Sequence, residues 1–196
     1  MLIPLVLKLN GVNYLINKFA KDIFTMTDIY ISLGSNVNRQ YHVQQGLKAI
    51  SDTFNIPFEQ LVLSSLFESE AIGFSGSAFY NMVIGLRTQY TLEQVVNKLR
   101  NIEINYGREL HAKKFSPRTL DLDLLLFDNL ITNTPAQLPR DEIDKNAFVL
   151  WPLSEVAPAL IHPVLQKSYR ALWQSYDKPS QQLKKVTSEW LQCSSE

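Results

Sequence analysis

The stretch Leu120–Phe127, LDLDLLLF, constrains the fold more than any other part of the chain. Side chains two positions apart on a strand share a face, so Asp121 and Asp123 would lie side by side. Further along, the acidic face becomes apolar at Leu125 and Phe127. Leucines would line the opposite face, namely Leu120, Leu122, Leu124 and Leu126. The pattern therefore predicts a strand that is largely buried on both faces and carries two carboxylates at one end.

The order of the other segments predicts the fold class. The clearest helix starts where Thr91 and Gln94 suit a capping box, and Gly107 can close its end. By apolar spacing we expect strands at 29–33, 61–67, 79–86 and 120–127, helices over 43–54 and 91–107, an apolar segment at 148–153 and a helix near 169–176. This order, β-α-β-β-α-β followed by extra helix, is ferredoxin-like. It is an α+β fold with a mainly antiparallel sheet and helices packed on it.

Length and composition favour one compact domain with terminal additions. The chain has 196 residues, of which 45% are hydrophobic and 19% are charged, as in globular proteins. We expect an N-terminal extension at 1–27, a domain at 28–177 and a polar, fraying tail at 178–196. A functional start at Met26 would be another account of the first residues.

Charge and cysteine content argue against several kinds of protein. Lys plus Arg and Asp plus Glu are 19 each, so the formal net charge is zero, whereas nucleic-acid binders carry a basic excess. No apolar run approaches the roughly 20 residues needed to span a bilayer. The single Cys193 cannot form an internal disulfide, which favours a reducing, cytoplasmic location. We therefore expect neither a nucleic-acid partner nor a membrane.

The acid pair is the strongest candidate for chemistry. Two adjacent carboxylates repel each other unless a cation bridges them, and hard oxygen ligands suit Mg²⁺. The preceding loop carries four cations, Arg108, Lys113, Lys114 and Arg118. Cations around a metal-binding acid pair suit phosphoryl transfer. Alternatively, Asp121 and Asp123 occupy a solvated strand face, where charges discourage edge pairing. Because the acids would repel each other, asparagine at either position is expected to cost little stability.

Two other residues have both a structural and a functional interpretation. Asn81 lies in an otherwise apolar strand, and is either a buried hydrogen-bonding residue or the reader of a heterocycle edge. Phe115 in the basic loop is either an aromatic lid or local packing. Neither a P-loop nor a dinucleotide-binding glycine motif occurs in the sequence.

Four sequence segments carry a resemblance to a known family. They are GSN after the first strand, GR before the basic loop, PRTLDLDLLLF and FVLWPLSEVAP. With these, the chain resembles the 6-hydroxymethyl-7,8-dihydropterin pyrophosphokinases of folate biosynthesis from about residue 28 to 176. The resemblance implies that the β,γ-pyrophosphoryl unit of ATP moves to the hydroxymethyl oxygen of the pterin, releasing AMP.

The resemblance also implies roles for individual residues. Two Mg²⁺ ions would be held by Asp121 and Asp123, and Asp121 would assist deprotonation of the hydroxyl. The catalytic set would be Asp121, Asp123, Arg108 and Arg118. The pterin pocket would comprise Ser69, Ile72, Gly73, Phe79, Asn81, Phe115 and Phe148. The ATP-binding residues would be Glu103, Arg108, Lys114, Arg118, Leu124 and Arg140.

The chain also departs from the family's pattern. The family commonly has Pro, Arg, Trp, His, Tyr and Arg where this chain has Glu70, Leu110, Phe115, Arg140, Asp141 and Asn146. The chain keeps the acid pair, but it differs from the family at several of the residues that would contact the nucleotide. Two alternatives follow: a paralogue that binds a pterin or nucleotide with impaired or reassigned catalysis, and a ferredoxin-like RNA-binding module. The latter would need a basic sheet face with exposed aromatics, not two acids.

Overall fold

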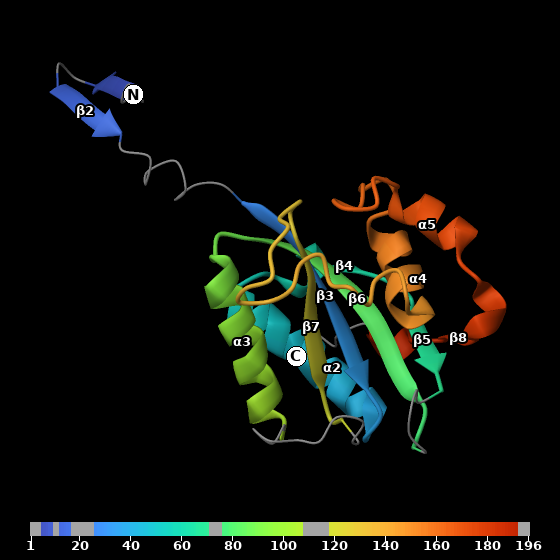
Figure 1. The fold of residues 1–196 in the computed structure, drawn as a ribbon. Helices are drawn as coiled ribbons and strands as arrows, with labels where there is room; N and C mark the ends of the chain where they lie inside the picture. Colours follow the sequence, from blue (N-terminus) through green and yellow to red (C-terminus); the bar gives the residue numbers. More distant parts are fainter. Residues whose placement is uncertain (1–4, 10–11, 17–25, 71–75, 108–117, 192–196) are drawn as a thin grey trace.

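The computed structural model describes residues 5–9, 12–16, 26–70, 76–107 and 118–191 (Figure 1). Its main sheet has the strand order β7-β3-β6-β5-β8, with β4 paired to β6 and antiparallel pairing throughout. The strands are β3 (Thr27–Ser35), β4 (Val62–Leu63), β5 (Leu66–Ser69), β6 (Phe79–Thr88), β7 (Asp121–Phe127) and β8 (Leu183–Val186). Separately, β1 (Leu5–Leu9) and β2 (Val12–Ile16) form an antiparallel pair. None of the described helices is long and apolar enough to cross a membrane.

The central strands confirm the ferredoxin-like prediction. Along the chain, β3, α2, β5, β6, α3 and β7 give the β-α-β-β-α-β order, and β7 and β6 flank β3. Within the described residues, the helices are α2 (Arg39–Phe54), α3 (Leu92–Asn105), α4 (Ala147–Val156) and α5 (Tyr169–Ser175), with three short 3-10 turns at Phe58–Gln60, Lys178–Ser180 and Glu189–Leu191. Helices α2 and α3 cover one face of the sheet, whereas α4 and α5 cover part of the other (Figure 1).

Two apolar clusters occupy the two faces of the sheet. The first lies beneath α2 and α3 and includes Ile31, Met82 and Leu122. The second lies beneath α4 and α5 and includes Val83 and Leu125. Removing such side chains from water stabilises the fold by about 1.5–3 kcal/mol each. Because both faces are packed, the strands hold their side chains in fixed positions.

Helix α3 begins and ends as the sequence predicts. The Thr91 hydroxyl accepts a hydrogen bond from the Gln94 backbone N–H at 3.3 Å, and the Gln94 side chain accepts one from the Thr91 N–H at 2.9 Å. Gly107 has a φ of 89°, a conformation that glycine adopts without strain. These residues define where α3 begins and ends.

Strand β7 differs from the prediction near its end. Tyr30 pairs with Leu126 and Ile31 with Leu124, so Leu125 is an extra residue in the strand. A bulge of this kind reverses the alternation of faces beyond it. Leu126 therefore packs in the second cluster beside Leu125 instead of continuing the leucine face, and Phe127 packs against the first. The expected continuous face ends at Leu124.

The segment after residue 177 is not simply a frayed tail. Strand β8 pairs with β5 and extends the sheet. The ring of Trp190 stacks on Tyr80 with centroids 6.3 Å apart, and its carbonyl accepts a hydrogen bond from Gln44 at 2.8 Å. The packed unit therefore extends beyond the predicted domain boundary. The predicted strand over 61–67 is likewise divided, because Ser64 and Ser65 separate β4 from β5.

Candidate active site

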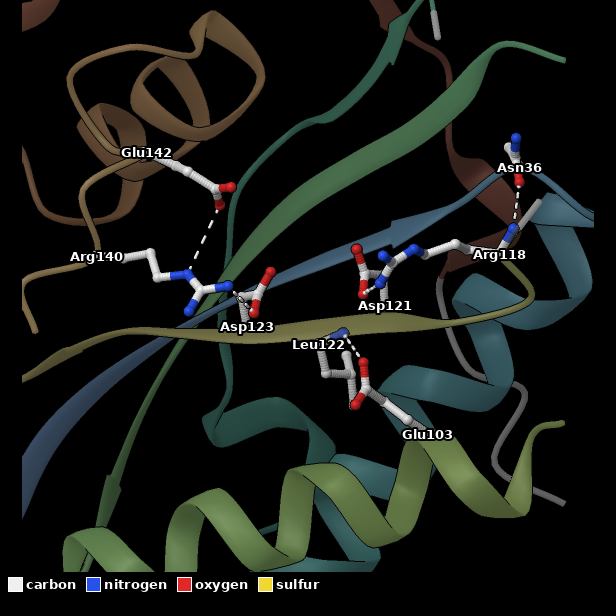
Figure 2. A network of polar contacts seen from close by, with 8 residues as sticks. All are labelled: Asn36, Glu103, Arg118, Asp121, Leu122, Asp123, Arg140 and Glu142. Carbon is white, nitrogen blue, oxygen red and sulfur yellow. Dashed lines mark hydrogen bonds and ion pairs between the residues drawn. The ribbon is translucent and has the colours of Figure 1, made fainter. Parts of the chain in front are cut away.

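Strand register places the acid pair on the sheet face opposite α2 and α3. Asp121 pairs with Gly34 and Asp123 with Ser32, while Leu122 between them faces the first cluster. The exposed fractions of the two acidic side chains are 28% and 30%, so both remain accessible to a ligand. The predicted side-by-side arrangement of the two carboxylates is confirmed, and both lie at the N-terminal end of β7 (Figure 2).

Each carboxylate of the pair contacts an arginine (Figure 2). The Arg118 guanidinium donates to Asp121, and an Arg140 nitrogen donates to an Asp123 oxygen at 2.6 Å. The GSN segment positions Arg118: the Asn36 side-chain oxygen accepts from the Arg118 N–H at 2.7 Å, and the Asn36 N–H donates to the Arg118 carbonyl at 3.0 Å. Thus the turn after β3 fixes the residue that leads into β7.

The bulge in β7 positions Arg140. The Leu125 carbonyl accepts a hydrogen bond from the Arg140 backbone N–H at 3.0 Å, which brings its side chain to Asp123. The Arg140 Nε lies 3.6 Å from a Glu142 oxygen. Burial opposes the charge of Arg140, but the surrounding carboxylates, chiefly that of Asp123, outweigh it and raise the pKa of the guanidinium. Arg140 therefore stays positively charged.

Glu103 joins α3 to the strand that carries the acids. It is only 4% exposed, and its carboxylate accepts a hydrogen bond from the Leu122 N–H at 3.0 Å. In Figure 2 it approaches β7 from the side opposite Asp121 and Asp123. A carboxylate at this position satisfies a backbone donor of the edge strand β7. Glu103 therefore holds the strand in place and also faces the adjoining cavity.

A cavity of about 330 Å³ lies between α3, β7 and the loop that ends at Arg140. Its lining is Val96, Leu99, Arg100, Glu103, Ile104, Leu122, Asp123, Leu124, Pro135, Ala136 and Arg140. The apolar side chains can hold a flat ring, and the two arginines can meet anionic groups. Sequence reasoning identified Glu103, Leu124 and Arg140, but it missed Arg100, whose helical position carries no signal for a cavity.

The space over Gly34, on the other side of Asp121, is bordered by the Asn81 amide oxygen and a Phe79 ring carbon, and we call this space the recess. The Asn81 amide nitrogen donates to the Ser69 hydroxyl at 2.9 Å, and Asn81 is only 7% exposed. A Cβ at Gly34 would lie 3.4 Å from the Asn81 Oδ1, 3.9 Å from the Asp121 Cβ and 3.9 Å from a Phe79 ring carbon. The absence of a side chain at Gly34 therefore leaves space between the Asn81 amide and the acid pair.

The remaining predicted residues are not all placed. Phe148 lies in the first turn of α4, half-buried against the second cluster on the same sheet face as the acids. Five predicted site residues lie outside the described residues, namely Ile72, Gly73, Arg108, Lys114 and Phe115. Within the described part of the chain, no group of three or more His, Cys, Asp or Glu side chains could hold a metal ion.

Together, the fold and the site define a class of enzyme. Two carboxylates paired with arginines lie between the recess and a cavity lined by both apolar and charged side chains. This arrangement suits a transferase that moves a phosphoryl group between two small molecules. The family model for 7,8-dihydro-6-hydroxymethylpterin-pyrophosphokinase (HPPK) matches residues 30–158. The chain belongs to this family, whose members are ATP-dependent diphosphotransferases of folate biosynthesis that act on a pterin.

Curated relatives agree with the family match. The chain is 30% identical over 145 residues to the 2-amino-4-hydroxy-6-hydroxymethyldihydropteridine pyrophosphokinase of Aquifex aeolicus, covering 72% of this chain and 88% of the relative. It is 34% identical over 143 residues to the enzyme of the same name from Haemophilus influenzae, covering 70% and 86%. These matches span most of each relative.

Solved structures support the fold. An HPPK-DHPS structure in complex with substrates matches with a TM-score of 0.59 at 12% identity, over 80% of this chain and 44% of that chain. The wild-type HPPK-DHPS of Plasmodium falciparum matches with a TM-score of 0.58 at 12% identity, over 76% and 44%. This chain therefore spans less than half of those longer proteins.

Proposed function

We propose that Asp121 and Asp123 are the centre at which this pyrophosphokinase transfers the β,γ-pyrophosphoryl unit of ATP to 6-hydroxymethyl-7,8-dihydropterin. The supporting observation is the register of β7, which puts the acid pair between the recess at Gly34 and the cavity beside α3. The recess takes the pterin and the cavity takes the nucleotide. The acids then lie where the two substrates meet.

Magnesium fits the acid pair by the chemistry of its donors. Mg²⁺ prefers oxygen ligands, keeps several waters and uses only one or two carboxylates beside substrate phosphates. Asp121 and Asp123 supply two accessible carboxylates on one face, and in this proposal they hold two ions together with ATP. The bound ions neutralise phosphate charge and polarise the phosphoryl group under attack.

In the proposed reaction, the pterin hydroxymethyl oxygen forms a bond to the β-phosphorus. The bond from that phosphorus to the oxygen bridging it to the α-phosphorus breaks, and AMP leaves with the bridging oxygen. Asp121 adjoins the recess and takes the hydroxyl proton. An alcohol is a weak nucleophile, but correct orientation corresponds to effective molarities of about 10⁵ to 10⁸ M. Positioning by the recess therefore supplies much of the rate.

The other proposed roles follow from side-chain chemistry. Asn81 offers an amide oxygen at the recess to the pterin edge, with Ser69 fixing its orientation, and Phe79 contributes a ring at the same recess. The remaining pterin contacts are assigned to Ile72, Gly73, Phe115 and Phe148. Arg118 and Arg140 meet the triphosphate, with Arg108 and Lys114 from the basic loop, while Glu103 and Leu124 border the nucleotide. We also propose a cytoplasmic location, consistent with one cysteine in the chain, and an N-terminal extension at 1–27 ahead of the pyrophosphokinase domain.

The test is a direct assay for AMP. The full chain is incubated with Mg-ATP and 6-hydroxymethyl-7,8-dihydropterin, and AMP is followed by chromatography, with a pterin-free reaction as control. We expect AMP to form only when the pterin is present, and Asp121→Asn to abolish its formation. AMP at the pterin-free rate would overturn the proposal and leave a protein that only binds these ligands.

A further inference from the structure

The acid pair is neutralised by cations from the chain itself. Asp121 contacts Arg118, and Asp123 contacts Arg140 at 2.6 Å. We propose that Arg140 is an exchangeable counter-cation: it occupies Asp123 until metal and nucleotide bind, and its guanidinium then moves to the triphosphate. This inference rests on the proposed function, because it concerns the same nucleotide.

The contacts of Arg140 suit such an exchange. Its backbone is anchored to the Leu125 carbonyl at 3.0 Å, so the side chain can turn about a fixed point. Its Nε is buried without a hydrogen-bond partner among the described residues, and the nearest Glu142 oxygen is 3.6 Å away. A guanidinium has five N–H donors arranged to grip phosphate. The unused donor shows that Asp123 and Glu142 do not satisfy Arg140 completely.

Arg140 also has a path to the nucleotide. Arg140 and Asp123 both line the cavity beside α3, so a triphosphate there meets the arginine and the carboxylate together. When Asp123 binds a metal ion, the Arg140 guanidinium loses its ion-pair partner, and the phosphate oxygens of the nucleotide then become its new partner. The side chain therefore exchanges one anion for another within the same cavity.

The exchange couples metal binding to nucleotide binding. Without nucleotide, a metal ion must displace Arg140 from Asp123, which weakens its binding. With nucleotide, the released arginine gains a phosphate contact, which strengthens the binding of both. An arginine that only bound phosphate would leave the affinity for metal alone unchanged. If Arg140 is exchanged as proposed, replacing it should strengthen the binding of metal alone and weaken the binding of metal with nucleotide.

The test compares two titrations of the full chain. Mn²⁺ binding is measured by electron paramagnetic resonance without nucleotide, and binding of α,β-methylene-ATP with Mg²⁺ is measured by calorimetry. For Arg140→Gln we expect Mn²⁺ alone to bind about two- to fivefold more tightly, the scale of one partly exposed ion pair. We expect the nucleotide analogue to bind about tenfold more weakly, the scale of one charge-assisted hydrogen bond.

Two variants serve as controls. Arg87→Gln removes the same charge from an exposed pair between Arg87 on β6 and Asp28 on β3, whose atoms lie 3.3 Å apart, and should change neither titration by more than about twofold. Arg140→Lys keeps a cation beside Asp123, so its affinity for Mn²⁺ alone should stay near that of the wild type. Unchanged or weaker binding of Mn²⁺ alone by Arg140→Gln would overturn the proposal that Arg140 is an exchangeable counter-cation. In that case, pterin-dependent AMP formation by the wild type would still support the proposed function.

Discussion

Replacing Asp123 by asparagine removes one negative charge from the acid pair with almost no change in shape. The carboxylate forms an ion pair with Arg140 at 2.6 Å and is a proposed metal ligand in the complex with substrates. An amide keeps an oxygen that can accept from Arg140, but it is a much poorer ligand for Mg²⁺. The variant should therefore separate catalysis from folding.

The two effects differ greatly in size. Loss of a metal ligand that stabilises transition-state charge by about 4 kcal/mol lowers turnover by about 10³-fold. Loss of a partly exposed ion pair costs about 1 kcal/mol of stability at most, or about 2–4 °C in the melting temperature. The expected small loss of stability therefore stands, but its reason changes: each acid has an arginine partner, so asparagine weakens an ion pair instead of relieving repulsion.

Two measurements on the same preparation test this reasoning. AMP formation with pterin and Mg-ATP gives turnover, and thermal unfolding without ligands gives stability. Asp121→Asn should behave in the same way, whereas Asp28→Asn, in an exposed pair remote from the acids, should leave turnover unchanged. Turnover of Asp123→Asn within about threefold of the wild type would refute the assignment of Asp123 as a metal ligand.

Other substitutions probe the surroundings of the acids. Glu103→Ala leaves the buried Leu122 N–H without its acceptor and should lower the free energy of unfolding in urea by about 1.5–3 kcal/mol, whereas Glu103→Gln should lose less; equal losses would contradict this role. Gly34→Ala places a methyl group 3.4 Å from the Asn81 amide oxygen and should raise KM for the pterin severalfold while KM for ATP stays constant. A larger change in KM for ATP would contradict the assignment of the recess to the pterin. Burial lowers the pKa of His162, so its contribution to stability should be complete above about pH 6.5 and decline as pH falls further; urea unfolding of His162→Asn should show a weaker decline, and an identical profile would exclude His162.

Local patterns in the sequence predicted the core of the fold well. The Thr91 and Gln94 side chains form their expected caps, because capping depends on residues three apart. Asp121 and Asp123 share a face because the period of a strand is two. The prediction failed at Leu126, because the bulge at Leu125 arises from pairing with β3, a strand about a hundred residues earlier in the chain.

Contacts between distant segments were the least predictable part of the site. The sequence places Arg140 well after Asp123, and only the fold of the intervening loop brings their side chains together. The cavity beside α3 likewise depends on where that loop passes. Trp190 was a weak signal for the packed C-terminal segment, since a lone tryptophan in a polar stretch does not show which surface it covers.

The central claim is that the site between the recess and the cavity transfers a pyrophosphoryl unit. Phosphorus NMR of the full chain with Mg-ATP and the pterin tests it most directly, because it identifies both products in one sample. We predict that AMP and a pterin diphosphate ester form in equal amounts, and that Asp121→Asn and Asp123→Asn form neither at a detectable level on the time scale of the wild-type reaction. ADP with a pterin monophosphate, or unchanged ATP, would contradict the account.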